Sequence, residues 1–323
     1  MRLVRLAILF AFLAFVTAAV LRRQEELQKV TDAEISDRYI PAAIISGAAA
    51  CGNRAVEAFD CGPACDSLKE ANAEVLYSDG DGANDPYVYL LHMPEDEALV
   101  IAHSPTNFSS FLSVLIDADF LLSPIEEGIL GEIDTELSSK VSVHSGFLRS
   151  VSKTLEELKK RLIEAMDRLG DSIKVIRFEG HSMGAASASI EAVLLSNIVY
   201  KRGYDLQLTT FGSPRVGDES FVNLLESVIP EGKRARITNQ NDKVPHLPGF
   251  PYKHYSGEVY IPKDDEKDIP LPAAHCVGRE DERCADKFNF FQRSKDAHEG
   301  LVSFITDYDF SHPLQSLLWS SIR

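Results

Sequence analysis

One serine stands in a pattern that can make it a nucleophile. Ser182 is the centre of the segment 180–184, GHSMG, which follows a short apolar run at 173–178 and precedes a helix-forming run at 184–200. Flanking glycines remove Cβ atoms that would clash in a tight strand-to-helix turn, and the turn presents the hydroxyl at a helix N-terminus, where negative charge is stabilised. The pattern predicts acyl transfer through a serine nucleophile; the alternative is a structural turn with a capping serine.

A serine hydroxyl needs a base and an orienting carboxylate to attack at neutral pH. Where the nucleophile sits in such a turn, the acid and then the histidine follow it along the chain. Asp242 lies in a loop directly after the expected strand 234–238 and is the candidate acid, with a turn aspartate as the alternative. His246 is too near Asp242 to be favoured as the base, and residue types do not choose among the others. The downstream histidines are His246, His254, His275, His298 and His312.

The elements that must position these residues alternate between strand and helix patterns from about residue 74 onward. Strands are expected at 87–91, 98–102, 173–178, 206–211 and 234–238, and helices at 148–169, 184–200 and 218–228. Such alternation is typical of one sheet covered by helices on both faces. Together with the serine turn, it predicts an α/β-hydrolase fold with a mostly parallel central sheet.

The beginning of the chain has the pattern of an export signal. Two arginines precede an apolar run at 6–16, and small residues follow at 17–19. The apolar run is shorter than the roughly 20 residues of a membrane span, so a retained anchor is the less favoured alternative. We therefore expect a secreted protein with three segments: a signal peptide at 1–19, an N-terminal helical segment at 20–50 and an α/β-hydrolase domain at 51–323.

Five cysteines fit an oxidising compartment. Cys61 and Cys65 flank a Gly-Pro turn, and Cys276 and Cys284 bracket a charged loop, so each pair can close a local bridge. Cys51 is then left over, and a buried free thiol is one interpretation of it. The cysteines and histidines lack the spacing of a zinc site, so no metal is expected. Acyl transfer through a serine nucleophile requires no organic cofactor, so none is expected either.

The charge of the chain bears on its partners. The formal net charge is −16, from 33 basic and 49 acidic residues, and no block of Lys and Arg stands out. These features argue against nucleic acid and against an anionic membrane as the main partner.

Four ordered motifs resemble the fungal class 3 lipase family, which includes triacylglycerol lipases and feruloyl esterases of filamentous fungi. The motifs are 143–147 (VHSGF), 180–185 (GHSMGA), 211–217 (FGSPRVG) and 241–248 (NDKVPHLP). The resemblance covers about residues 45–305. It implies Ser182 as the nucleophile and Asp242 as the acid.

The resemblance also distinguishes among the histidines. Family members carry the base in a D-x-H pattern shortly before the chain ends, and Asp296-Ala297-His298 resembles it. This implies His298 as the base, with His312 second and His275 third. The family's final cysteine, which pairs in several members with one near Cys51, has no counterpart after Cys284, so Cys51 is expected to be free.

The oxyanion donors and a lid are implied in the same way. The N–H of Met183 follows the nucleophile, and Thr106, in the segment 103–107 (HSPTN), occupies the place of a second donor in an H-x-G-T-like motif. Pro105 replaces the usual glycine and restricts the backbone there, which leaves room for a lipase-like binding protein without turnover.

The segment that follows Thr106 resembles a lid. Phe108, Phe111, Leu112 and Leu115 share one face if the segment is helical. The family has a short amphipathic lid helix here that opens at an oil–water interface, and an ordinary core helix is the alternative. The chain's only N-glycosylation sequon, 107–109, lies in this region.

Taken together, these features predict a secreted carboxylic ester hydrolase with a Ser-His-Asp triad and an acyl-enzyme intermediate. An acylglycerol lipase acting on lipid at an oil–water interface is favoured. A feruloyl-type or small-ester esterase is the first alternative, and a non-catalytic lipase-like binding protein the second. No stable membrane span is expected. His144 and Arg215 are expected to be structural.

Overall fold

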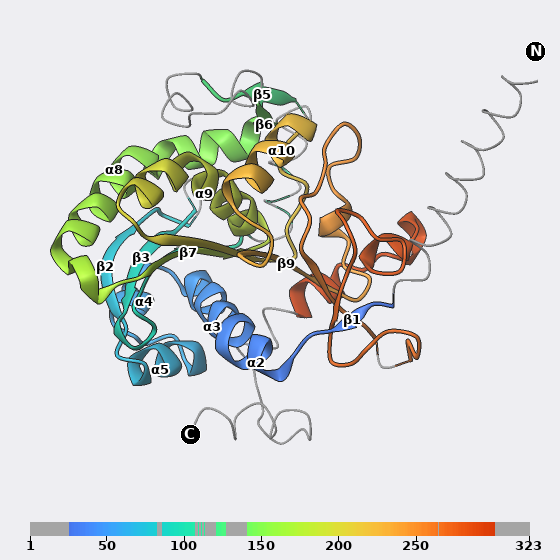
Figure 1. Ribbon diagram of the computed structural model, residues 1–323, viewed down its shortest axis with the longest axis horizontal. Helices are drawn as coiled ribbons and strands as arrows, with labels where there is room; N and C mark the ends of the chain where they lie inside the picture. Colours follow the sequence, from blue (N-terminus) through green and yellow to red (C-terminus); the bar gives the residue numbers. More distant parts are fainter. Residues whose placement is uncertain are drawn as a thin grey trace, which may run out of the picture.

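The architecture is a large sheet between two layers of helices (Figure 1). The computed structural model describes residues 26–82, 86–106, 109, 111, 113, 121–126, 141–263 and 265–300. The expected signal peptide at 1–19 lies outside these residues, as do His312, the sequon residues 107 and 108, and most of the expected lid helix.

The helices and strands have the following bounds. The main helices are α2 Asp32–Glu34, α3 Ile40–Ala48, α4 Asn53–Glu57, α5 Pro63–Glu70, α8 Ser145–Leu169, α9 Met183–Lys201 and α10 Glu219–Val228. The strands are β1 Gln28–Lys29, β2 Glu74–Asp79, β3 Val88–Met93, β4 Ala98–His103, β5 Leu122–Pro124, β6 Ser142–His144, β7 Val175–His181, β8 Asp205–Phe211, β9 Arg234–Asn239, β10 Glu258–Ile261 and β11 Ala274–His275.

The described strands of the large sheet lie in the order β1-β11-β10-β9-β8-β7-β4-β3-β2. The neighbours from β4 to β10 pair in parallel, whereas the strands at both edges pair antiparallel. The chain therefore has the α/β-hydrolase fold, with the parallel strands in the middle, as the sequence predicts. A parallel centre brings the carboxyl ends of β7, β8 and β9 to one edge, where loops can meet.

Both faces of this sheet are buried, which explains the continuous apolar runs of its strands. Successive side chains of a strand point to opposite faces. In β3, Leu90 joins the core under α8 and α9, whereas its neighbour Leu91 joins the core under α3 and α5. Figure 1 shows α8, α9 and α10 on one side of the sheet and α3, α4 and α5 on the other.

The predicted strands and helices are confirmed, with ends that shift for local reasons. The strand predicted at 173–178 runs as β7 to His181, because Glu179 to His181 still pair with β8. The helix predicted from residue 148 begins at Ser145, because the His144 side chain accepts a hydrogen bond from the Gly146 N–H and caps it. His144 therefore has the structural place expected of it.

The N-terminal segment expected to be helical at 20–50 is helical only in part. β1 pairs with β11, because the backbone of Gln28 and Lys29 adds to the open edge there. From Asp32 the chain is helical to Cys51, and α3 buries Ala42 and Ile45 against the sheet. The segment thus contributes both an edge strand and a covering helix.

The expected disulfides are present as Cys61–Cys65 and Cys276–Cys284. Cys51 is free, and it is exposed rather than buried, because it ends the 3₁₀ turn η2, Ala49–Cys51, that follows α3. Within the described residues, α9 alone is long and apolar enough to cross a membrane, and it is mostly buried as the central core helix.

Candidate active site

The turn between β7 and α9 holds Ser182 in a strained backbone conformation. Its φ is 59° and its ψ is −123°, and its N–H donates to the Phe211 carbonyl of β8 at 2.9 Å. Such conformations persist only where the surroundings fix them. A Cβ on Gly180 would lie 2.4 Å from the Gly184 carbonyl oxygen, so this glycine lets the helix start close to the strand.

Ser182, His298 and Asp242 lie together in one chain of hydrogen bonds. The Ser182 Oγ lies 2.8 Å from His298 Nε2, and His298 Nδ1 lies 2.8 Å from Asp242 Oδ2. All three side chains are buried. The arrangement has the order and reach that a serine nucleophile, a base and an orienting acid require.

The loop after β9 fixes the Asp242 carboxylate. Its Oδ1 accepts a hydrogen bond from the Val244 N–H at 2.8 Å, which leaves Oδ2 for His298. Burial raises the pKa of Asp242 above its ordinary value, and His298 and the Val244 N–H oppose this rise. The hydrogen bonds that the ionised carboxylate accepts thus offset the free-energy cost of burying its charge.

Hydrogen bonds to the backbone of its own segment also fix the position of His298. The helical turn that carries it includes Ala297, whose carbonyl accepts a 2.7 Å hydrogen bond from the Asn239 side chain at the end of β9. Ser294, four residues before His298, forms a bridge with Asp242. The segments of the base and the acid are therefore tied together by main chain as well as by the triad.

Gly212 lies close to both the base and the acid. The sequence patterns give it no role beyond its place in the motif 211–217. Its φ is +54°, and a Cβ built on it would lie 2.9 Å from the His298 ring and 3.0 Å from Asp242 Oδ2. Only glycine combines this backbone conformation with so close an approach.

His181, next to the nucleophile, stacks on the base. The ring centroids of His181 and His298 are 4.5 Å apart, and the rings are inclined by 27°. Burial, and then the neighbouring His298, lower the pKa of His181 well below its ordinary value. His181 is therefore neutral at physiological pH, and its ring face lies against the base.

The loop after β4 lies against the N-terminus of α9. A Cβ on Gly184 would lie 2.4 Å from the His103 carbonyl oxygen, so this glycine admits the loop. Thr106 Oγ1 lies 3.6 Å from the Met183 Sδ, which places the two predicted oxyanion residues side by side. His103 Nε2, 2.7 Å from the buried Glu191 Oε2, joins the end of β4 to the middle of α9.

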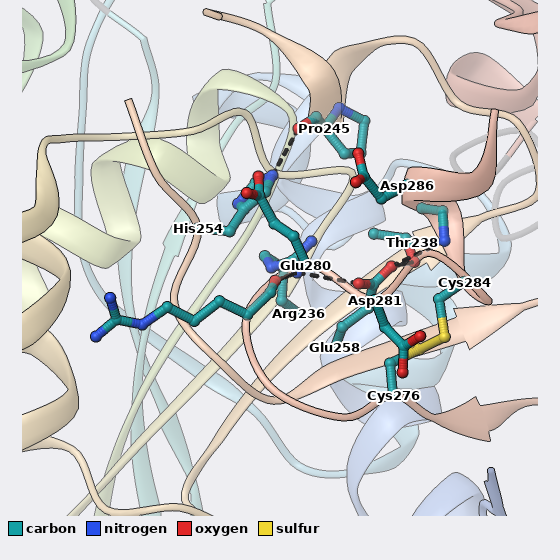
Figure 2. A network of polar contacts seen from close by, with 12 residues as sticks. Arg236, Thr238, Pro245, His254, Glu258, Cys276, Glu280, Asp281, Cys284 and Asp286 are labelled. Carbon is teal, nitrogen blue, oxygen red and sulfur yellow. Dashed lines mark hydrogen bonds and ion pairs between the residues drawn. A yellow bond between two sulfur atoms is a disulfide. The ribbon is translucent and has the colours of Figure 1, made fainter. Parts of the chain in front are cut away.

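A buried polar network supports the loop that carries Asp242. The first short helix after Asp242 is η6, Val244–His246. The Arg215 guanidinium donates to the His246 carbonyl at 2.8 Å and to the Pro248 carbonyl at 3.1 Å, and Glu280 orients it at 2.6 Å. His254 Nε2 lies 2.6 Å from the Pro245 carbonyl oxygen. Figure 2 draws this contact as a dashed line. Arg215 is thus structural, as expected.

The same network reaches the disulfide Cys276–Cys284 (Figure 2). Arg236 binds Glu258 at 3.2 Å and the Arg279 carbonyl at 2.9 Å, and Glu258 also accepts from Thr238 at 2.7 Å. Burial, followed by nearby arginines, lowers the pKa of His246 to about 3. His246 is therefore a neutral member of this network and lies away from the triad chain.

The other candidates occupy different places. His275 lies on β11 and pairs with Glu34 at 3.0 Å. Phe111 is buried and stacks on Phe147 at 6.5 Å, while its expected lid partners lie outside the described residues. In the part of the chain that the structure describes, no group of three or more His, Cys, Asp or Glu side chains is arranged to hold a metal ion.

Sequence comparisons find lipases that are similar to this chain. The family model for lipase (class 3) matches residues 100–252. Secreted mono- and diacylglycerol lipase 2 of Gibberella zeae is 34% identical over 157 residues, 44% of this chain and 36% of that protein. Secreted mono- and diacylglycerol lipase 3 of the same fungus is 27% identical over 204 residues, 62% of this chain and 61% of that protein. The chain thus spans only 36% and 61% of the lengths of these relatives.

Solved structures share the fold at lower identity. Lipase II from Rhizopus niveus superposes with a TM-score of 0.67 at 24% identity, covering 84% of this chain and 96% of that chain. Lip2 lipase from Yarrowia lipolytica superposes with a TM-score of 0.68 at 21% identity, covering 84% of this chain and 94% of that chain. These likenesses establish the fold.

Proposed function

The chain belongs to the class 3 lipase family, and we propose that it is a serine carboxylic ester hydrolase acting through Ser182, His298 and Asp242. The single observation that carries this proposal is the buried hydrogen-bonded chain of these three residues at a strained strand-to-helix turn.

In the acylation step, Ser182 Oγ attacks the ester carbonyl while His298 Nε2 takes its proton. Asp242 holds the Nδ1–H tautomer of His298 and stabilises the imidazolium that forms. The Met183 N–H at the start of α9 and Thr106 stabilise the oxyanion, and the helix dipole adds to this stabilisation. His298 then protonates the leaving alcohol, and the acyl group stays on Ser182.

In the deacylation step, the same groups act on water. His298 removes a proton from a water molecule, which attacks the acyl-enzyme carbonyl. The oxyanion is stabilised again by Met183 and Thr106. Collapse of the tetrahedral intermediate returns the proton from His298 to Ser182 Oγ and releases the carboxylic acid.

We assign acylglycerols as the substrate class and propose that the protein is secreted. The relatives named as secreted mono- and diacylglycerol lipases support both assignments, as does the export-signal pattern at 1–19. One structural neighbour, a fungal lipase–inhibitor complex, serves as a model for interfacial activation in lipases, which supports action at an oil–water interface.

Hydrolysis of graded substrates tests this function. The purified protein is assayed on p-nitrophenyl esters of increasing chain length, on emulsified mono- and diacylglycerols and on soluble feruloyl esters. We expect activity on the acylglycerol emulsions and its loss in Ser182→Ala and His298→Ala. Activity on feruloyl esters alone would replace the substrate class, and no ester hydrolysis by the wild-type protein would overturn the proposal.

A further inference from the structure

Two adjacent phenylalanines project from the surface of the segment that leads to His298. Phe290 is 61% exposed and Phe291 is 94% exposed. Their rings pack edge to face, with centroids 5.7 Å apart and an interplanar angle of 86°. Two large apolar side chains held together in water cost free energy, and such a feature usually marks an interaction site.

The turn that carries the pair is closed by its own hydrogen bonds. It is the 3₁₀ turn η8, Phe290–Gln292, preceded by Asn289. The Asn289 side chain accepts from the Phe291 N–H at 3.0 Å, and the Gln292 side chain accepts from the Asn289 N–H at 3.0 Å. The Gln292 N–H donates to the Asn289 carbonyl at 3.0 Å. These N–H groups can enter an apolar phase without losing a partner, which removes a large part of the usual cost of such burial.

Two cationic side chains, Lys243 and Arg293, lie next to the turn that carries the pair. The Lys243 ammonium lies 5.3 Å from the centre of the Phe290 ring. The Arg293 guanidinium donates to the Phe288 carbonyl at 3.0 Å, directly beside the turn. An apolar tip with cations at its base matches the layers of a lipid surface, where acyl chains lie beneath phosphate groups.

The turn is also coupled to the triad. Lys243 directly follows Asp242, and its N–H donates to the Ser294 carbonyl at 3.1 Å. The Ser294 N–H donates to the Asn241 carbonyl at 2.8 Å, and the Asn241 side chain donates to the Gln292 carbonyl. An object bound at Phe290 and Phe291 is therefore connected through short hydrogen-bonded segments to both the acid and the base.

We propose that Phe290 and Phe291, which we term the aromatic pair, anchor the protein in a zwitterionic lipid–water interface. The proposal rests on the proposed function in taking lipid as the partner. A protein partner fits less well, because a stable protein interface needs about 800 Å² on each side, far more than two side chains provide. The anchor lies in the segment that leads to the base and is bonded to the loop of the acid; in the sequence it is far from the segment that resembles a lid.

Vesicle flotation tests the anchor without turnover. The full chain carrying Ser182→Ala is mixed with vesicles of phosphatidylcholine alone. Adding Phe290→Ser and Phe291→Ser should weaken vesicle binding at least about tenfold, because each substitution removes an apolar side chain from the bilayer. Adding Phe290→Leu and Phe291→Leu should retain most of the binding, because the side chains stay apolar.

A matched control uses an exposed aromatic residue at the opposite end of the molecule's central helix. Tyr200 is 40% exposed and lies near the end of α9, about 25 Å along the helix from Ser182. Tyr200→Ser should bind vesicles like the parent. With the wild-type Ser182 restored, the protein carrying Phe290→Ser and Phe291→Ser should hydrolyse a soluble short-chain ester at the wild-type rate. It should hydrolyse emulsified acylglycerol more slowly than wild type.

The outcomes separate the two proposals. Equal vesicle binding by the serine and parent variants would overturn the anchor, whatever the hydrolysis assays give. Absence of ester hydrolysis with vesicle binding that depends on the aromatic pair would overturn the proposed enzyme and leave the anchor standing.

Discussion

At the residue scale, the close approach of the base and the acid depends on the absence of a side chain at Gly212. A Cβ on Gly212 would enter the space of both the His298 ring and the Asp242 carboxylate. We expect Gly212→Ala to lower kcat on a soluble ester about 10- to 100-fold, because small displacements of a catalytic group are costly. KM should change little. Steady-state kinetics on p-nitrophenyl butyrate measures both.

Gly203 provides the matched control for this substitution. It also has a positive φ, +82°, but a Cβ there would meet no atom within 4 Å. Gly203→Ala carries the same kind of backbone strain and should therefore lose stability without losing kcat. Equal losses of kcat in the two variants would show that strain, rather than crowding of the triad, is responsible.

The pH dependence of stability depends on a buried carboxyl group of β7, three positions before the nucleophile. Burial raises the pKa of Glu179 to about 7, although Arg177 lies 3.2 Å away and opposes the rise. Asp96 raises this pKa further and Arg38 lowers it. The folded protein therefore holds a proton on Glu179 at a pH where the unfolded chain has released it.

This raised pKa predicts that Glu179 weakens the fold as pH rises. The folded protein favours the protonated form of Glu179. The unfolding free energy that this preference provides is fully present below pH 4.5, the ordinary pKa, and is lost as pH rises through about 7. The loss is on the order of 3 kcal/mol. Glu179→Gln should remove it, so that the variant gains stability relative to wild type between pH 5 and pH 8. Urea unfolding at both pH values measures this difference, and an unchanged difference would refute the assignment.

Local sequence patterns could identify some of these residues and not others. Ser182 and Asp242 stand out because a tight turn and a post-strand loop are local features. The choice of His298 needed the family resemblance, since the fold, not the sequence around it, brings it 116 positions back to Ser182. Gly212 and the pair of His103 and Glu191 could not be assigned roles, because their roles come only from contacts between distant segments.

At the scale of elements, the loop closed by Cys276 and Cys284 supports the loop that carries the acid. Glu280 in the closed loop orients Arg215, which holds the carbonyls of His246 and Pro248. Cys61 and Cys65 also close a short loop, but that loop begins α5 on the far face of the sheet. The two disulfides should therefore differ in their effects on catalysis.

We expect Cys276→Ser with Cys284→Ser to lower kcat on a soluble ester about 10- to 100-fold. Cys61→Ser with Cys65→Ser should leave kcat unchanged. Both double variants should lose about 2–3 kcal/mol of unfolding free energy, because both release a short loop. Kinetics and urea unfolding of the two proteins measure these effects. A kcat loss of the same size in both would indicate a general effect of destabilisation.

Elements with long apolar or periodic runs could be predicted, and short strands near one edge of the sheet could not. β7, β8, α8 and α9 are strongly patterned, because each is buried along its whole length or along one face. β10 and β11 have only a few residues each, and their pairing depends on partners far along the chain. Helix starts moved by a few residues because side-chain caps, such as that of His144, lie outside the apolar pattern.

At the scale of the whole molecule, the N-terminal segment is integral to the fold. β1 extends the sheet at one edge, and α3 covers the face opposite α8 and α9 (Figure 1). The sequence predicts this segment to be helical but gives no indication of where it packs. The order of strands in the sheet likewise cannot be predicted from any single segment and follows from the fold class. The position of the serine turn, between a strand and a helix, can be predicted from its motif.

The central claim is that Ser182 becomes a nucleophile because His298 takes its proton. Labelling by a fluorophosphonate, followed by intact mass and peptide mapping, tests it most directly. We predict one phosphonyl group on Ser182, none on Ser182→Ala, and labelling of His298→Ala slowed at least about 100-fold. Labelling of Ser182→Ala at another residue, or labelling of His298→Ala at the wild-type rate, would contradict the account.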